Sequence, residues 1–477
     1  LNRGDLDALL AALEIGQRRV RELVERRGPD GFERAMRGTM DRTEAAARAV
    51  LRDIPPGTYD FVEYFEDDYV SELPVRLQAR LTSRGDGTVE LDFHGCDPEV
   101  GAAINLPTGG RRHHPFLSLA LVNFVVTHAA GLHPNAGILR CVDLVLPEHS
   151  VVNASLPAAC GMRFSTAMRV HELVLGALNQ AVPGRVPAGG SSALVVTYVA
   201  TEDRVVVANP VQGGSGGGPH CDGVAAADYP ANFLRSVPAE ILEAEIPVLV
   251  RRFGLRPDSE GAGRHRGGFG VDYALEVLDP RAVVIMRGKD RHRFGAWGAH
   301  GGGAGAPGAN DVRTADGATA GLGKVTVFRP ALGDVCTVSA GGGGGFGDPL
   351  DRPVADVLAD VADGLVSAAR ARDVYGVVVL DGVVDPERTR ALRERGRRTG
   401  ATFDLGPGRE AWQRRWSAVS DLLADALPAL PHRLRRLAQR EVYRALDRAS
   451  AGDPAPITRE SAATAWKQVC TGLGITI

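Results

Sequence analysis

The chain has 477 residues, enough for two or three ordinary domains, and 44% of them are hydrophobic, which supports sizeable cores. Its formal net charge of −3 lacks the basic excess that nucleic-acid-binding and membrane-surface proteins normally show. No apolar run reaches the ~18 residues of a membrane span, and the six scattered cysteines form no C-x-x-C pair. We therefore expect a cytoplasmic protein with free thiols and no nucleic-acid or membrane partner.

The apolar spacing along the chain predicts a mixture of helices and strands. A first helix carries Leu6 to Val24 and stops at Gly28-Pro29, and a second runs from about Gly31 to Leu51. Apolar segments further on predict strands at 59–65, 73–81, 88–93 and 141–146, buried helices at 116–130 and 164–182, and strands at 194–200, 205–208, 248–256, 271–278 and 282–286. The sequence thus predicts an α+β (mixed α/β), multi-layer body.

A run of five glycines, Gly341 to Gly345, is followed by the segment Phe346-Gly347-Asp348-Pro349. Without Cβ atoms the run can approach another surface closely. Pro349 suits a helix start, and the spacing of the apolar residues from Val354 to Leu365 predicts a helix after it.

The composition shifts after about residue 400. Tryptophans and leucines stand among arginines, and Pro428 and Pro431 interrupt them, so we expect a broken amphipathic helical appendage that packs on itself or docks a partner. We expect four segments: a helical hairpin at 1–58, the mixed body at 59–340, the glycine loop with its helix at 341–400, and the appendage at 401–477.

The string from Gly341 to Val379 resembles the carboxyl-terminal motif of B-type subunits in the hydantoinase/oxoprolinase family. Further blocks are similar to the family in the same order: 91–107, 135–137, 213–223, 232–247 and 258–270. The resemblance covers roughly residues 1 to 400, and residues 405–477 depart from the pattern.

The resemblance implies a partner and cofactors. It implies an A-type subunit with an actin-like ATPase fold, which binds ATP and Mg and activates a carbonyl by phosphorylation, and a divalent metal (Zn, Mn or Fe) in the assembled complex. Hydantoinases and oxoprolinases open a cyclic amide with water, whereas the related acetone and acetophenone carboxylases join an activated ketone to a carbon dioxide equivalent. The resemblance also implies a small-molecule substrate and a hetero-oligomer.

The resemblance also implies an amino-terminal segment with a G-T-H-x-x-D-type motif and a histidine-rich strand, which would supply the metal ligands. This sequence contains neither, so we leave the metal ligands unassigned. We expect either a separate polypeptide that carries them, or a chain from which that part is lost or not included. In both cases we expect the chain to be inactive alone.

Polar residues in the permissive loops match the family's characteristic positions and are the candidate catalytic residues: Asp222, Asn232, Glu240, Asp258 and Arg266. Glu240 and Glu243 have the i,i+3 spacing that places two carboxylates on one helical face. Such a pair can serve a metal or a general base, or form caps and salt bridges to Arg252 or Arg266.

Other motifs leave alternatives open. The histidines at 94, 113, 114, 128 and 133 could bind a transition metal, but their spacing fits no zinc pattern, and surface or satisfied core histidines are the simpler interpretation. Cys160, and Cys221 beside His220, are thiols of the kind that could act as nucleophiles, although the family's mechanism has no place for one. The glycine blocks 213–223 and 301–308 could cradle an anion or allow close packing, and neither is a Walker loop.

Three functions follow. The first is a B-type subunit, or its carboxyl-terminal portion, of an ATP-dependent cyclic-amide hydrolase. The second is a subunit of an ATP-dependent ketone carboxylase, and the 5% aromatic content is weak evidence against an aryl ketone as its substrate. The third is a non-catalytic scaffold subunit of such a complex.

Overall fold

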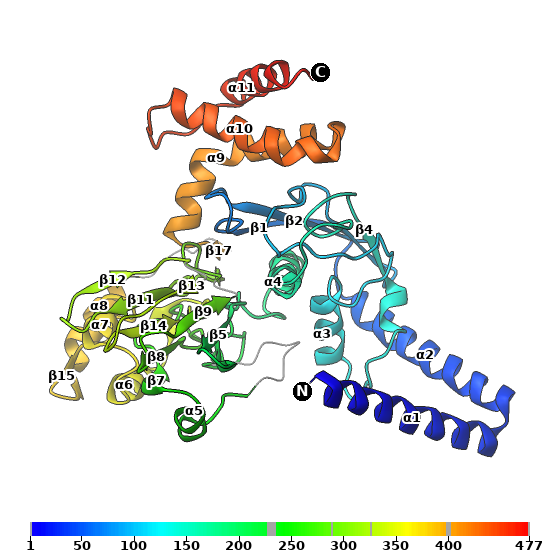
Figure 1. Ribbon diagram of the computed structural model, residues 1–477, viewed down its shortest axis with the longest axis horizontal. Helices are drawn as coiled ribbons and strands as arrows, with labels where there is room; N and C mark the ends of the chain where they lie inside the picture. The colour runs from blue at the N-terminus through cyan, green and yellow to red at the C-terminus, as the bar shows by residue number, and fades with distance from the viewer. Residues whose placement is uncertain (1, 227–234, 288–289, 325–326, 397–401, 476–477) are drawn as a thin grey trace.

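The computed structural model describes residues 2–226, 235–287, 290–324, 327–396 and 402–475. Helices and small sheets are stacked in layers around several buried clusters of apolar side chains (Figure 1). The expected mixed α+β class is therefore confirmed. None of the helices in these ranges is both long enough and apolar enough to cross a membrane.

The first two helices form a hairpin that projects from the body (Figure 1). Helix α1 (Asn2–Arg27) ends at Gly28, whose φ of 71° reverses the chain, and α2 (Pro29–Leu51) begins at the following proline. The predicted stop is confirmed. Leu9 and Leu13 of α1 remain 64% and 70% exposed, whereas α2 buries its last turns against the body.

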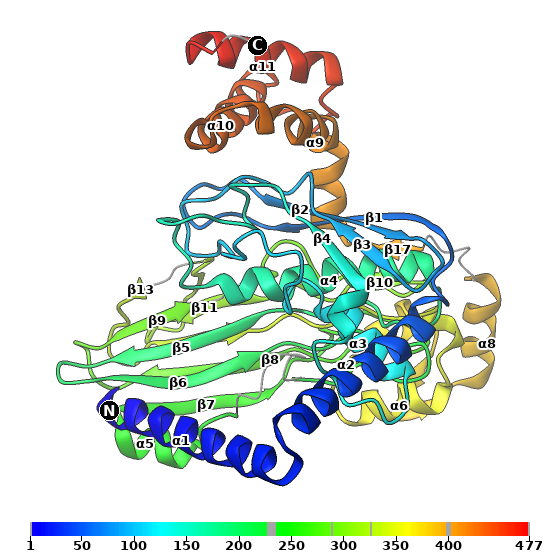
Figure 2. The same cartoon turned by 90° about the vertical axis from the view of Figure 1, so that its right-hand side faces the viewer.

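The first sheet has the order β1-β2-β3-β4 and covers one side of a buried helix. Its strands, close to the predicted bounds, are β1 (Gly57–Phe65), β2 (Val75–Ser83), β3 (Val89–Asp92) and β4 (Val142–Val145). Helix α4 (Arg163–Ala181) lies under β1 and β2, and α3 (Leu119–His128) lies beside it; the short 3-10 helix η1 (Ile138–Cys141) precedes β4 (Figure 2). The glycine Gly176 lets α4 approach closely, because a Cβ there would overlap the ring of Phe61.

Two further sheets face each other across a second core below α4. One has the order β13-β9-β5-β6 and the other β12-β11-β14-β8-β7. The predicted strands appear as β5 (Leu194–Ala200), β6 (Val205–Gln212), β7 (Val248–Leu255), β8 (Val271–Val277) and β9 (Val283–Arg287). Helix α5 (Ala239–Glu245) precedes β7, and the sequence did not predict the short strands β10 (Gly298–Ala299), β11 (Ala309–Arg313), β12 (Thr319–Gly321), β13 (Val327–Phe328) and β14 (Val335–Ser339).

The glycine run lies buried between other backbone segments, as predicted. Gly342 and Gly345 both donate their N–H groups to the segment 303–306, at 3.0 and 2.9 Å, whereas Gly343 donates to Gly268 and Gly344 to Gly189. A return to the same neighbour after three residues is the geometry of a polyproline II helix, whose backbone groups all point outward. Side chains would prevent this packing, because a Cβ at Gly343 would overlap the Ser215 carbonyl.

The helix predicted after the glycine run needs correction at both ends. Pro349 begins a short 3-10 turn, η2 (Pro349–Asp351), and α6 (Val354–Ala362) begins only after Pro353. Leu365 lies beyond the helix, because Gly364 takes a φ of 70° and reverses the chain. The short helix α7 (Ala368–Asp373), the ribbon β15 (Val379–Leu380) with β16 (Val383–Val384), and α8 (Pro386–Arg395) follow.

The last part of the chain is helical and packs against the first sheet (Figure 1). After β17 (Phe403–Asp404) come α9 (Pro407–Ala426), η3 (Leu427–Ala429), α10 (His432–Ala449) and α11 (Arg459–Gly472), with the interruptions at the two predicted prolines. The helices share an apolar core of their own. Ion pairs join them to the body: Arg76 to Asp421 at 2.8 Å and Arg436 to Asp68 at 2.7 Å.

Candidate functional site

A cavity of about 350 Å³ opens between α4 and the glycine-rich segments. Its walls are mostly apolar, and polar groups lie at one side. The lining residues are His171, Glu172 and Leu175 of α4, Pro187, Ala188, Gly190, Ser191 and Ala193 of the segment before β5, and Gly213 to Gly216 with Val224. Apolar walls with a few convergent polar groups are typical of small-molecule sites.

The polar side of this cavity is formed by two neighbours on α4. Glu172 is 1% exposed, and its Oε2 accepts the N–H of Gly190 at 2.6 Å. Its Oε1 lies 3.3 Å from Nδ1 of His171, whose Nε2 is 3.1 Å from the Asn123 amide. A carboxylate and an imidazole held side by side can accept and donate hydrogen bonds to an amide, while the apolar wall can cover a hydrocarbon ring.

The loop opposite Glu172, residues 190–192, is held in place by a buried arginine. Arg291, fully buried, donates to the carbonyl oxygens of Ser191 at 3.0 Å and Gly190 at 3.3 Å. The next residue, Ser192, has a φ of 43°, and its buried Oγ has no hydrogen-bond partner among the described residues. Non-glycine residues with such a φ are uncommon and cluster at functional sites.

Arg291 belongs to a buried cluster of charges at the base of the site. Its Nη1 lies 3.2 Å from Oε1 of Glu63, and Arg409 of α9 lies 3.1 Å from Oε2 of the same carboxylate. A third guanidinium, that of Arg169 on α4, lies 3.7 Å away. Burial raises the pKa of Glu63, but the three guanidinium groups together outweigh it and hold that pKa below its usual value.

The predicted residues Asp222 and Arg266 are brought together at the outer end of the 213–224 segment. Arg352 binds both carboxylate oxygens of Asp222 at 2.7 and 2.8 Å, and the backbone N–H of Arg266 donates to the same carboxylate at 3.0 Å. The Arg266 side chain bonds Asp360 of α6, which Arg352 also reaches at 2.9 Å. These ion pairs fasten the glycine segments to α6.

The electrostatics of Asp222 indicate a fixed anion. Burial raises the pKa of Asp222. The hydrogen-bonded Arg352 guanidinium lowers it, and the lowering outweighs the effect of burial, so the net shift is downward. The pKa of Arg352 is raised, because its pairing with Asp222 and Asp360 outweighs burial. Asp222 is therefore a poor proton acceptor in this arrangement, and its geometry supports a positioning role.

The other predicted residues lie apart from Asp222. Asp258 accepts the N–H of Ser367 at 2.8 Å and so joins its loop to the start of α7. Glu240 is exposed on α5, and Glu243 accepts the N–H of Val250 at 2.7 Å. Asn232 lies outside the described residues. The suggested salt bridge from this carboxylate pair to Arg252 does not form, because Arg252 lies 3.3 Å from Asp272 instead.

The alternative histidine and cysteine sites gain no geometric support. Nδ1 of His113 and of His128 each lies beside a backbone carbonyl oxygen, at 3.0 and 2.8 Å. Burial raises the pKa of the Cys160 thiol, which disfavours the reactive thiolate. Within the described ranges no group of three His, Cys, Asp or Glu side chains could hold a metal ion.

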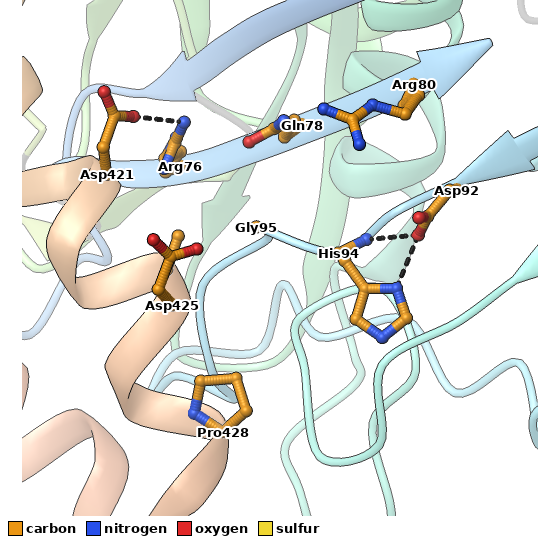
Figure 3. Close-up of a pocket in the computed structure, with 10 residues that line it drawn as sticks. Arg76, Gln78, Arg80, Asp92, His94, Gly95, Asp421, Asp425 and Pro428 are labelled. Atoms are coloured by element: carbon orange, nitrogen blue, oxygen red, sulfur yellow. Dashed lines mark hydrogen bonds and ion pairs between the residues drawn. The ribbon is translucent and has the colours of Figure 1, made fainter. Parts of the chain in front are cut away.

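A second cavity, of about 440 Å³, lies between β2, the turn after β3 and α9 (Figure 3). Several of its charged side chains are paired: Arg76 with Asp421 at 2.8 Å and the His94 ring with Asp92 at 2.6 Å. Arg80 pairs with Asp60 at 2.8 Å. Since most of these charges are already compensated, the cavity under α4 is the better candidate.

Sequence patterns missed His171, Glu172 and Arg291, although a signal existed. His171 and Glu172 stand in a helix that is buried along most of its length, and buried charged residues are rare unless they are paired. Their partners lie on the segment 190–191, which gave no motif to search for.

A family model described as Hydantoinase B/oxoprolinase matches residues 1–349. The beta chain of the caprolactamase from Pseudomonas jessenii is 33% identical over 415 residues, which are 82% of this chain and 68% of the relative. The B-type chain of a putative D-/L-hydantoinase from Pseudomonas sp. strain NS671 is 30% identical over 82% of this chain and 67% of the relative.

Solved structures resemble the fold as well. The crystal structure of ATP-dependent caprolactamase from Pseudomonas jessenii matches 82% of this chain and 69% of the solved chain, with a TM-score of 0.70 and 30% identity. A nucleotide-free structure of acetone carboxylase matches 93% of this chain and 66% of the solved chain, with a TM-score of 0.68. At 18% identity the second likeness concerns the fold alone.

Proposed function

The chain belongs to the hydantoinase B/oxoprolinase family, and we propose that it is a B-type subunit, or a portion of one, of an ATP-dependent cyclic-amide hydrolase. The observation that carries the proposal is the likeness to caprolactamase, which extends over 82% of this chain both in sequence and in fold. The partner we propose is an A-type subunit that binds ATP and Mg, and we propose that the chain is inactive without it.

We place the ring of the cyclic amide in the cavity under α4. The size of about 350 Å³ suits a small ring, and the apolar side formed by Leu175, Ala193 and Val224 suits its methylene groups. The amide end would face Glu172 and His171, whose carboxylate and imidazole orient it by hydrogen bonds. The glycine segments bring backbone N–H and C=O groups to the opposite wall.

The metal that the family resemblance implies does not fit the described part of this chain. No group of three metal-ligating side chains stands together in it. We therefore derive no step through a metal on these residues. We propose that a separate polypeptide or segment supplies the ligands in the complex.

The experiment is co-expression of the chain with an A-type subunit, followed by an assay of ADP release with hydantoin, 5-oxoproline and caprolactam. ADP release that depends on one of these rings, with formation of the ring-opened amino acid, would support the proposal. A complex that hydrolyses ATP at the same rate with and without each ring, and forms no ring-opened product, would contradict the proposal.

A ketone carboxylase subunit is the second candidate, and one observation favours it. The likeness to acetone carboxylase covers 93% of this chain, which residues 1–404 cannot supply alone, so it includes a part of the helical appendage. The discriminating assay supplies acetone and isotope-labelled bicarbonate to the same complex. Labelled acetoacetate would favour the carboxylase, whereas a complex inert in both assays would leave a scaffold subunit.

A further inference from the structure

Helix α1 is exposed along nearly its whole length and forms an edge of the molecule (Figure 1). Of residues 3–27, only Glu22 and Val24, near the turn into α2, are half-buried, and the others are exposed. The helix has 26 residues and is therefore about 39 Å long. Helices in proteins gain most of their stability by packing an amphipathic face. A helix this long and this exposed has no packing partner for most of its length in the single chain.

The apolar side chains of α1 form one stripe that repeats every seven residues. The stripe consists of Leu6, Leu9, Leu13, Gly16, Val20 and Leu23, with alternating steps of three and four residues. Its five apolar side chains are between 40% and 70% exposed, and Leu13 in the middle is the most exposed of them. Single exposed leucines are ordinary, but a continuous apolar stripe marks an interaction surface. Three heptads of this spacing are the pattern of a helix that pairs with another helix.

The stripe is symmetric about the point between residues 14 and 15. When two copies of α1 run antiparallel and cross at that point, Leu6 of one copy faces Leu23 of the other. At the next level Leu9 faces Val20. Each outer layer therefore joins two large apolar side chains, and a twofold axis repeats both layers on the other side of the crossing.

The central layer places Leu13 of one copy over Gly16 of the other. In the single chain Gly16 has no such neighbour, because a Cβ at this position would meet no described atom within 4 Å. A glycine inside a helix lowers the stability of that helix. A large side chain over a small one lets two helices interdigitate, so the pair gives Gly16 a role that the single chain does not.

The charges of α1 are complementary in the same arrangement. Residues 2–14 carry three carboxylates and one arginine, and residues 15–27 carry five arginines and two carboxylates. Antiparallel copies place the acidic half of each against the basic half of the other, whereas parallel copies place like charges together. Asp5 and Arg26 stand beside the two ends of the stripe. The Nε of Arg26 donates to the Glu22 carbonyl oxygen at 3.3 Å, so the two terminal nitrogens of Arg26 remain for Asp5 of the other copy.

We propose that α1 is a self-association helix, which pairs antiparallel with α1 of a second copy of this chain about a twofold axis. The pairing buries the apolar stripe of both copies and brings opposite charges together at both ends. The inference goes beyond the proposed hydrolase function and does not depend on it, because no residue of α1 lines the cavity under α4.

The test is the molar mass of the full chain in solution, measured by sedimentation velocity over a concentration series. We expect a dimer at micromolar concentration that dissociates on dilution. Leu13→Asp places a charge in both central layers, so the dissociation constant should rise at least about 100-fold. The matched control is Ile15→Asp, which adds the same charge at an exposed side chain on the opposite face of α1. It should leave the dissociation constant within about threefold of the wild type. Circular dichroism checks that both variants are folded.

An exchange of charges tests the antiparallel direction. Asp5→Arg and Arg26→Asp each set like charges against each other at both ends of the pair, so each should weaken the dimer about five- to tenfold. The double variant restores the pairs of opposite charge and should dimerise like the wild type. In a parallel pair Asp5 would not meet Arg26, and the double variant would be no better than the single ones.

A chain that is monomeric throughout the series, or a dimer that survives Leu13→Asp, would overturn the proposal. A monomer that binds an A-type subunit and loses that binding in the Leu13→Asp variant would also overturn it, because the apolar stripe would then belong to that partner. A dimer that Leu13→Asp abolishes but that the double charge exchange does not restore would overturn the antiparallel arrangement.

Discussion

Arg409, in the first turn of α9, places its Nη1 3.1 Å from Oε2 of Glu63 at the end of β1, and both side chains are buried. The pair joins two parts of the chain that are 346 residues apart. It also links the helical appendage to the cluster that holds Arg291 and, through it, the loop opposite Glu172. The appendage is therefore coupled to the candidate site through one carboxylate.

Removal of that carboxylate should be strongly destabilising. Glu63→Gln keeps the shape but leaves the guanidinium groups of Arg169, Arg291 and Arg409 without their shared anion, and breaking a buried ion pair costs about 3–5 kcal/mol. The measurement is the free energy of unfolding from urea titration. The control is Asp60→Asn. Asp60 lies on β1 like Glu63, but its pair with Arg80 of β2 is exposed, so the substitution should cost less than about 1 kcal/mol. Equal losses in the two variants would contradict the central role of Glu63.

Glu66 predicts a dependence of stability on acid pH. Burial raises its pKa, but Lys324 and Arg169 outweigh burial and lower the pKa of Glu66 to about 2. A carboxylate with a depressed folded-state pKa stabilises the protein above its unfolded pKa, and that contribution is lost as the pH falls toward the folded value. We expect the wild type to lose stability between about pH 4.5 and 2.

The matching variant is Glu66→Gln, compared with the wild type by thermal unfolding across this range. It should be less stable at pH 7, and its melting temperature should fall less steeply below pH 4.5. Parallel curves for the two proteins would show that Glu66 does not carry this pH dependence.

A glycine-to-alanine substitution should have opposite effects in the buried glycine run and in helix α2. Gly343→Ala would push a Cβ into the Ser215 carbonyl, and because both partners are backbone, neither can rotate away. We expect a loss of about 3 kcal/mol or more. Gly38→Ala, in the exposed part of α2 with open space around it, should instead stabilise by about 0.5–1 kcal/mol. The measurement is the melting temperature of both variants. A Gly343→Ala variant as stable as the wild type would show that the backbone around Gly343 has room for a Cβ atom.

The glycine run and the helices around it mark what the sequence could and could not predict. Periodicity located α1, α4 and most long strands within a few residues, because their apolar residues recur with the period of a helix or a strand. The short strands from β10 to β14 escaped prediction, since two to five residues that include glycine and polar types give no period to recognise. Arg352 escaped as the partner of Asp222, because pairing across 130 residues leaves no local trace.

The candidate site itself supplies the last prediction. If Glu172 orients the amide of a bound ring, Glu172→Gln should lower ring-dependent ADP release about 10- to 100-fold, because a hydrogen bond to a charged group is worth about 1.5–3 kcal/mol and the glutamine carries no charge. Its melting temperature should change little, because the amide keeps an acceptor for the Gly190 N–H. Asp222→Asn, in the ion-pair network that fastens the glycine segments to α6, is the contrasting variant. It should lower the melting temperature and leave the kcat of the folded fraction within about tenfold of the wild type. A Glu172→Gln enzyme with normal turnover, or an Asp222→Asn enzyme that is stable but inactive, would move the reaction centre from the cavity under α4 to the Asp222 network.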